Sequence, residues 1–135
     1  MAFSHHAPAV SPLSTSMVLL LNLVIGLGHF LVLFNTGAYL PMIPHVAGSL
    51  GVNPDFADWT QADFFLAMAL AFPTSPWFLQ RWGEMRVLAG AFMAFTLASA
   101  ICAQTNHYDA FLSARILQGF SGGLTIPVSL QIILR

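Results

Sequence analysis

Four long apolar runs, separated by short polar links, make up most of the chain. They cover about residues 17–43, 59–79, 87–103 and 111–134 of 135. Each is near or above the ~17 to 25 residues with which an α-helix crosses a hydrocarbon core about 30 Å thick. The pattern predicts an all-α integral membrane protein. Residues 1–16 form a short tail, and residues 17–135 form one region of four transmembrane helices.

The composition agrees with an apolar solvent and excludes several functions. Hydrophobic residues make up 57% of the chain and charged residues 7%, against about 25% charged residues in an ordinary soluble domain. A net charge of -1 gives no indication of nucleic-acid binding. With Cys102 as the single cysteine, neither an internal disulfide nor a paired-cysteine metal site can form. No nucleophile with a base, metal-ligand set or phosphate-binding loop is evident, so we expect no enzyme, metal or cofactor.

The few basic residues predict the orientation in the membrane. Arg81 and Arg86 lie in the link between the second and third runs, and Arg135 follows the fourth run. The other two links, residues 44–58 and 104–109, contain no lysine or arginine. Cytoplasmic loops carry an excess of basic residues. The second link and both termini, including the tail, are therefore predicted to be cytoplasmic.

Local signals predict where two of the helices begin or end. Asp58 and Gln61 have the spacing of a capping box, in which a side-chain oxygen and a glutamine satisfy free backbone N–H groups. This predicts that the second helix begins at Asp58. Pro41 and Pro44 are predicted to mark the end of the first helix, because proline cannot extend a helix without losing a hydrogen bond.

A polar stripe follows the first span. Asn22, His29 and Thr36 are seven residues apart, so a helix stacks them on one side, with Gly26 on the same stripe. Facing lipid would be unfavourable for such a stripe. It either forms hydrogen bonds to a neighbouring helix or lines a transport cavity, with His29 titrating near neutral pH.

The fourth span combines a charge with a cluster of glycines. Arg115 and Gln118 are three residues apart, Gly119 and Gly122 continue that side, and Gly119 with Gly123 makes a small-xxx-small contact. Arg115 either extends to the membrane surface or points inward and holds an anionic group.

Asp63 is the nearest carboxylate to Arg115 by expected depth, about one turn inside the second span. It is either the partner of Arg115 or a carboxylate stabilised by the positive end of its own helix. The third span has only Thr96, Ser99 and Cys102 as weakly polar members, which is typical of a peripheral helix facing lipid.

Taken together, these motifs resemble a known family. The segment 115–123 resembles the R-x-x-Q-G-x-x-G-G segment in helix four of major facilitator superfamily drug/proton antiporters. The closest resemblance is to the fourteen-helix EmrB/QacA type. The link 76–86 resembles the signature between helices two and three of that superfamily, and Arg81, Gly83 and Arg86 carry its polar pattern. Residues 59–73 are similar to the opening of helix two.

The resemblance implies a secondary transporter of the bacterial inner membrane that exports small organic compounds in exchange for protons. The chain departs from the family pattern where an acid is usual, with Gln80 in the signature loop and Val32 in helix one. Proton coupling would then depend on another group, and His29 or Asp63 is the hypothesis.

Transporters of this superfamily have two six-helix halves, each built from three-helix repeats. Four spans correspond to one repeat and the first helix of the next, so the chain is expected to be an N-terminal piece of a larger transporter. Its partners would be the lipid bilayer, a small-molecule substrate, and the remaining helices or another membrane chain. The alternatives are a self-contained four-helix exporter acting as a dimer, and a non-transporting membrane protein that packs against partners.

Overall fold

The described residues form four helices. The computed structural model describes residues 14–134, with α1 at Thr15–Leu50, α2 at Pro54–Trp82, α3 at Glu84–Gln104 and α4 at Tyr108–Ile133. All four are long and apolar enough to cross a membrane. The prediction of an all-α fold with four membrane-spanning helices is confirmed. Residues 1–13 of the predicted tail, and Arg135, lie outside the described residues.

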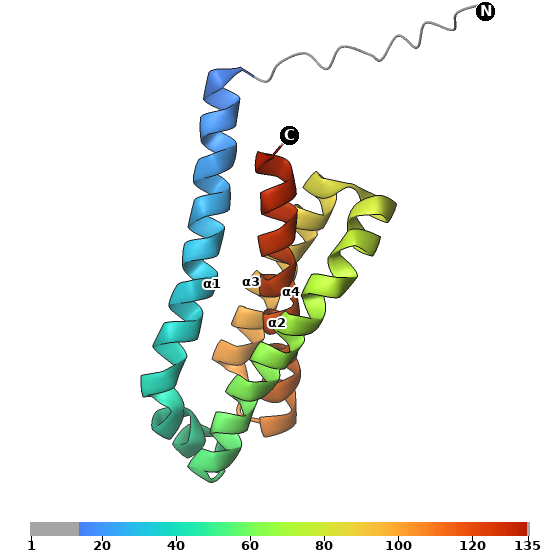
Figure 1. Cartoon of the computed structure of the whole chain (residues 1–135). Helices are drawn as coiled ribbons and strands as arrows, with labels where there is room; N and C mark the ends of the chain where they lie inside the picture. The colour runs from blue at the N-terminus through green and yellow to red at the C-terminus, as the bar shows by residue number, and fades with distance from the viewer. Residues whose placement is uncertain (1–13, 135) are drawn as a thin grey trace, which may run out of the picture.

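Helix α4 is the centre of the arrangement. It packs along α2 and α3, whereas α1 makes fewer contacts with either α2 or α4. Half of the most apolar window of α4 is buried, against 17% of that of α1. Figure 1 shows α1 running beside α4, and Ile25 of α1 is buried in one cluster with Val128 of α4. The polar chemistry of α4 is therefore enclosed, while most of α1 remains accessible.

Helix α1 is longer than predicted, because neither proline ends it. Pro41 and Pro44 lie inside the helix, which continues to Leu50. Each proline removes only one backbone hydrogen bond, and membrane helices tolerate this. The helix ends where Gly51 adopts a left-handed conformation, with φ at 65°, and its N–H returns to the carbonyl of Ala47. The 36 residues of α1 extend about 54 Å at 1.5 Å per residue, well beyond a hydrocarbon core of about 30 Å.

Helix α2 begins earlier than the predicted capping box. Asn53 caps it, with its side chain accepting a hydrogen bond from the N–H of Asp55 at 3.4 Å, and Pro54 occupies the first turn. Proline is favoured there because its missing N–H would have no partner within the helix. Asp58 and Gln61 lie inside the helix, so the prediction of a start at Asp58 is wrong. Gln61 is thereby available for another role.

A single residue joins α2 to α3. Gly83 is both the C-cap of α2 and the N-cap of α3, with φ at 79°. A positive φ of this size favours glycine, which has no Cβ. The predicted link of residues 80–86 is therefore mostly helical, and the turn is confined to Gly83.

Two glycines bring α2 and α4 together. A Cβ on Gly119 would collide with the backbone of Phe64, including its carbonyl oxygen. A Cβ on Gly123 would lie 2.5 Å from the carbonyl oxygen of Met68 and 2.8 Å from the Cβ of Ala71. Glycines at this spacing let two membrane helices approach at backbone distance. The small-xxx-small pair of α4 thus contacts α2.

Three further glycines lie in α1 or face it. A Cβ on Gly122 would lie 3.2 Å from Cγ1 of Val32. Gly26 has open space where a Cβ would be, so the structure does not place it in a helix contact. Gly28 makes the close approach instead, against the ring of Phe92. The reason is rotational: Gly28 and Val32 lie on the buried stripe of α1 with Ile25, whereas Gly26 is about 100° away from Ile25 around the helix.

We expect Gly119→Ala to lower the free energy of unfolding by about 1 to 3 kcal/mol, because the added methyl group meets backbone atoms that cannot rotate away. Gly90→Ala is the matched control, since a Cβ there meets nothing within 4 Å. Unfolding in mixed detergent, followed by circular dichroism, measures both. Equal losses in the two variants would contradict a close α2–α4 contact at Gly119.

Candidate functional site

Arg115 is enclosed within the helices. Only 2% of its surface is exposed, and it is the largest fully buried side chain among the described residues. Of the two alternatives for Arg115, the structure therefore has the inward-pointing side chain and not the one that extends to the membrane surface. A charged side chain near the centre of a bilayer costs at least about 2.5 kcal/mol, so its partners must offset this cost.

Three amide side chains from three helices hold the guanidinium. Nη1 of Arg115 donates to Oδ1 of Asn35 on α1 at 2.9 Å and to Oε1 of Gln118 on α4 at 2.8 Å. Nη2 donates to Oε1 of Gln61 on α2. Because an arginine has only donors, each amide presents its oxygen. These hydrogen bonds tie α1, α2 and α4 together at one group.

Two aromatic rings flank the same guanidinium. Its central carbon lies 4.1 Å from the ring centroid of Tyr39 on α1 and 4.4 Å from that of Phe64 on α2. A cation over a ring face is stabilised by the ring quadrupole, by about 2 kcal/mol or more when both groups are desolvated. The rings thus provide a second source of stabilisation for the buried charge.

Further hydrogen bonds hold this first set of partners in place. The hydroxyl of Tyr39 donates to the carbonyl of Ala57 at 3.0 Å and also contacts the hydroxyl of Thr60. Nε2 of Gln118 donates to the hydroxyl of Ser99 on α3 at 2.7 Å. All four helices therefore contribute to the network around Arg115. Ser99 also shows that α3, predicted to be peripheral, has one polar contact on its inner face.

The charge of Arg115 is met only by neutral groups. Its hydrogen-bond partners are amides, and no carboxylate is among them. Two donors of the cluster, Nε of Arg115 and Nε2 of Gln61, are buried and have no hydrogen-bond partner within the described part of the chain. The cluster is thus a fixed positive charge with spare donors.

Asp63 is not a partner of Arg115, so the predicted pair is not formed. Asp63 is two residues after Gln61, which places the two side chains about 200° apart around α2. Gln61 and Phe64 face α4, and Asp63 points elsewhere and is only half-buried. Gln61, which was predicted to cap α2, is the partner of Arg115 in place of Asp63.

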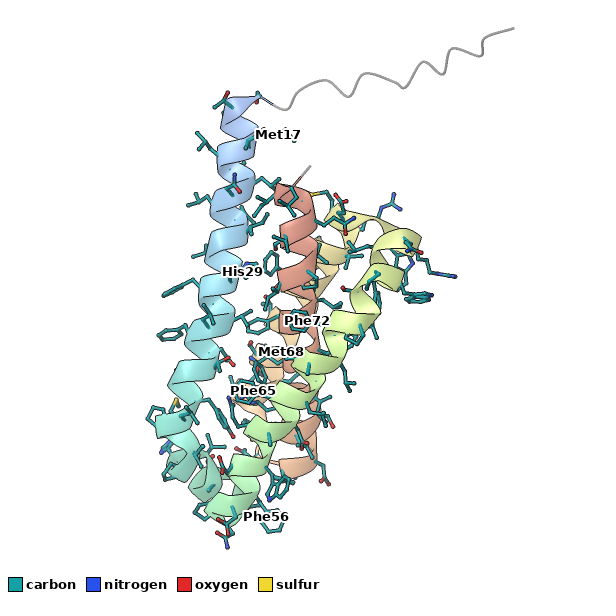
Figure 2. All side chains as sticks on the ribbon, in the orientation of Figure 1. Met17, His29, Phe56, Phe65, Met68 and Phe72 are labelled. Atoms are coloured by element: carbon teal, nitrogen blue, oxygen red, sulfur yellow. The ribbon has the colours of Figure 1, made fainter. Side chains whose placement is uncertain are left out.

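The polar stripe of α1 stays outside the Arg115 cluster. Asn22 is exposed, while His29 and Thr36 are half-buried. Nδ1 of His29 lies 2.9 Å from the carbonyl of Ile25, and the hydroxyl of Thr36 donates to the carbonyl of Val32 at 2.9 Å, both within α1. Figure 2 shows His29 on the N-terminal half of α1. The stripe therefore borders the buried face of α1 without contacting another helix through these hydrogen bonds.

The residues of the link between α2 and α3 lie at the surface. Arg81 and Arg86 are exposed, on either side of Gly83. The guanidinium of Arg81 lies 5.6 Å from the ring centroid of Trp77. Arg86 and Gly83 line a cavity of about 490 Å³ at this end of the bundle. Arg81 and Arg86 are thus exposed at the surface, whereas Arg115 is buried.

Sequence reasoning missed five members of the cluster: Asn35, Tyr39, Gln61, Phe64 and Ser99. Asn35 adjoins Thr36 but falls off the seven-residue stripe, and Gln61 had a local explanation as a cap. The spacing of two residues in α1 could have indicated part of the cluster. Asn35 and Tyr39 are four residues apart, so a helix places them on one side together.

Comparison with known proteins gives a consistent result. The sequence profile of the Major Facilitator Superfamily matches residues 25–135. "Probable multidrug resistance protein EmrY" of Escherichia coli (strain K12) is 29% identical over 135 residues, which is 100% of this chain and 26% of that protein. "Multidrug resistance protein B homolog" of Mycobacterium tuberculosis is 39% identical over 77 residues, 57% of this chain and 14% of that protein.

A third relative, "Multidrug export protein EmrB" of Haemophilus influenzae, is 28% identical over 123 residues, 91% of this chain and 24% of that protein. The chain thus spans about a quarter or less of the length of these curated relatives. No solved structure matches the chain significantly.

A double-mutant cycle tests the Arg115 cluster. We expect Asn35→Leu and Arg115→Met to show a coupling free energy of about 1.5 to 3 kcal/mol, the range for a hydrogen bond to a charged group. Unfolding of the two single variants and the double variant gives this value. The control cycle combines Asp63→Asn with Arg115→Met and should be additive within about 0.5 kcal/mol. Coupling in the control but not in the first cycle would overturn the assignment of Asn35 as the partner.

Proposed function

Because this chain belongs to the Major Facilitator Superfamily, we propose that its four helices are part of a transporter of small organic compounds. The membrane would be the bacterial inner membrane, and the direction would be export, as the names of the relatives suggest. These relatives are about four times as long as the match. The four helices would therefore work with further helices, either in the same chain or in another.

The observation that carries this proposal is the buried, uncompensated charge of Arg115. A guanidinium inside the membrane region is energetically unfavourable, so its presence there indicates a function. Its amide partners cannot neutralise the charge. The buried donors on Arg115 and Gln61 that lack a partner leave the cluster short of one acceptor. A substrate group, or a carboxylate from a further helix, would complete it.

Two accessible surfaces supply the expected wall of a substrate path. On α2, Phe65, Met68 and Phe72 follow one another at helical spacing and project toward the side of α1 (Figure 2). Phe65 is 47% exposed and Phe72 is 45% exposed. On α1, the stripe with His29 is likewise accessible. Apolar and aromatic lining with a few polar groups is typical of small-molecule sites.

Proton coupling would involve His29 or Asp63. Both are half-buried, and neither belongs to the Arg115 cluster. Imidazole and carboxylate groups can each take up and release a proton. Helix α1 has no carboxylate to perform this task.

The proposed orientation places both termini in the cytoplasm. Its support is the exposure of Arg81 and Arg86 at the joint between α2 and α3, where basic side chains can reach the negatively charged inner surface. Modification of cysteines introduced at position 84 or 106 by a membrane-impermeant reagent would distinguish the two sides.

Transport by the complete transporter in proteoliposomes tests the proposal. We expect uptake of Nile red into these proteoliposomes above the level of empty liposomes. Arg115→Met should lower this uptake at least about tenfold, because the substitution removes the charge and leaves three buried amides without their donor. Ala69→Leu, on an exposed position of α2, should keep the wild-type rate. Uptake equal to that of empty liposomes across neutral and charged dyes would overturn the proposal.

The coupling groups can be tested in the same vesicles. His29→Gln or Asp63→Asn is expected to abolish accumulation driven by a proton gradient while leaving downhill exchange of the dye. The reason is that only the driven process needs a group that changes protonation state. If both variants accumulate the dye at the wild-type level, neither group couples transport to protons.

A further inference from the structure

A cavity of about 340 Å³ lies between α1 and α3. Its walls are mainly apolar and aromatic, and its polar members include Asn35, Thr96 and Ser99. The volume falls within the range of small-molecule sites, about 300 to 1,000 Å³.

Asn35 connects this cavity to the buried charge. Its oxygen accepts the hydrogen bond of Arg115 at 2.9 Å, which fixes the orientation of the amide and leaves its nitrogen as a donor. Ser99 has both roles filled, since it donates to the carbonyl of Phe95 at 2.9 Å and accepts from Gln118 at 2.7 Å. The cavity therefore offers a hydrogen-bond donor at Asn35, backed by a positive charge.

The charge behind the wall restricts what can bind. The guanidinium of Arg115 has amide partners only, and a positive potential is weakly screened in a medium of low polarity. A cation in the cavity would be repelled. A fully ionised anion would have to leave water before it reached a site at the depth of the bilayer, which is unfavourable. An uncharged molecule with an acceptor group meets neither obstacle.

We propose that the cavity between α1 and α3 binds uncharged aromatic compounds that carry a hydrogen-bond acceptor. Asn35 determines the preference against cations, because it supplies Arg115 with a neutral partner where an aspartate would supply a compensating charge. Asparagine and aspartate have nearly the same shape, so Asn35→Asp changes the charge of the site with little change in its form. This binding does not require transport, and it can be measured on the chain alone.

The test uses two probes of similar size, neutral anthracenemethanol and cationic anthracenemethylammonium. Their fluorescence is titrated with the purified chain in phosphatidylcholine nanodiscs, and empty nanodiscs give the background. We expect saturable binding of the neutral probe and about tenfold weaker binding of the cation. Asn35→Asp should strengthen binding of the cation about tenfold and weaken binding of the neutral probe, because a carboxylate has no N–H to donate to its acceptor group. Asn35→Leu, which has no charge to offer, should leave the cation weakly bound.

Two further variants locate the site. Ala38 lines the cavity, so Ala38→Phe should fill it and abolish saturable binding of the neutral probe. Ala69→Phe, at an exposed position on α2, should leave binding unchanged.

Two results would overturn the site itself. Neutral-probe binding that does not saturate means that the probe only partitions into lipid, and saturable binding that survives Ala38→Phe in a folded variant means that the probe binds elsewhere. Equal affinity of the wild-type chain for the two probes, or equal gains for the cation in Asn35→Asp and Asn35→Leu, would overturn the role of Asn35. None of these measurements depends on transport, so failure of the transport assay and failure of this site are separate results.

Discussion

The rest of the structure depends on keeping the guanidinium of Arg115 inside the membrane region. Amides from α1, α2 and α4 and two aromatic rings surround it. Helix α1 otherwise makes few contacts with its neighbours. Asn35 and Tyr39 therefore do much to fix the rotation of α1 about its own axis. A charge that is unfavourable by itself thus becomes the point at which three helices are aligned.

The glycines of α4 make this alignment possible. Gly119 lies one turn from Arg115, and the absence of its side chain admits the backbone of Phe64 on α2. That close approach places the ring of Phe64 and the amide of Gln61 at the guanidinium. The arginine and the glycines therefore act together: the glycines allow α2 and α4 to approach closely, and this short distance lets residues of α2 contact Arg115.

The sequence allowed prediction of those features that depend on one helix at a time. Apolar runs indicated the four helices, and the charge and spacing within α4 singled out Arg115 and Gly119. The partners of Arg115 depend on how neighbouring helices are rotated, which no local pattern encodes. Gln61 shows the difficulty, because a plausible capping box explained it locally while Asn53 and Pro54 formed the actual start of α2. The prediction that Pro41 and Pro44 end α1 likewise applied a rule for soluble helices, and membrane helices tolerate such prolines.

The joint at Gly83 determines how the bundle can deform. With a single residue between two helices, the relative motion of α2 and α3 is limited to the few backbone torsions at that residue. A tilt of α2 must therefore displace the beginning of α3, because the two helix ends stay one residue apart. The longer connection from α3 to α4 spans Thr105 to His107 and has more freedom. A movement of the four helices would therefore keep the ends of α2 and α3 together at Gly83, whereas α3 and α4 can separate more at the opposite end.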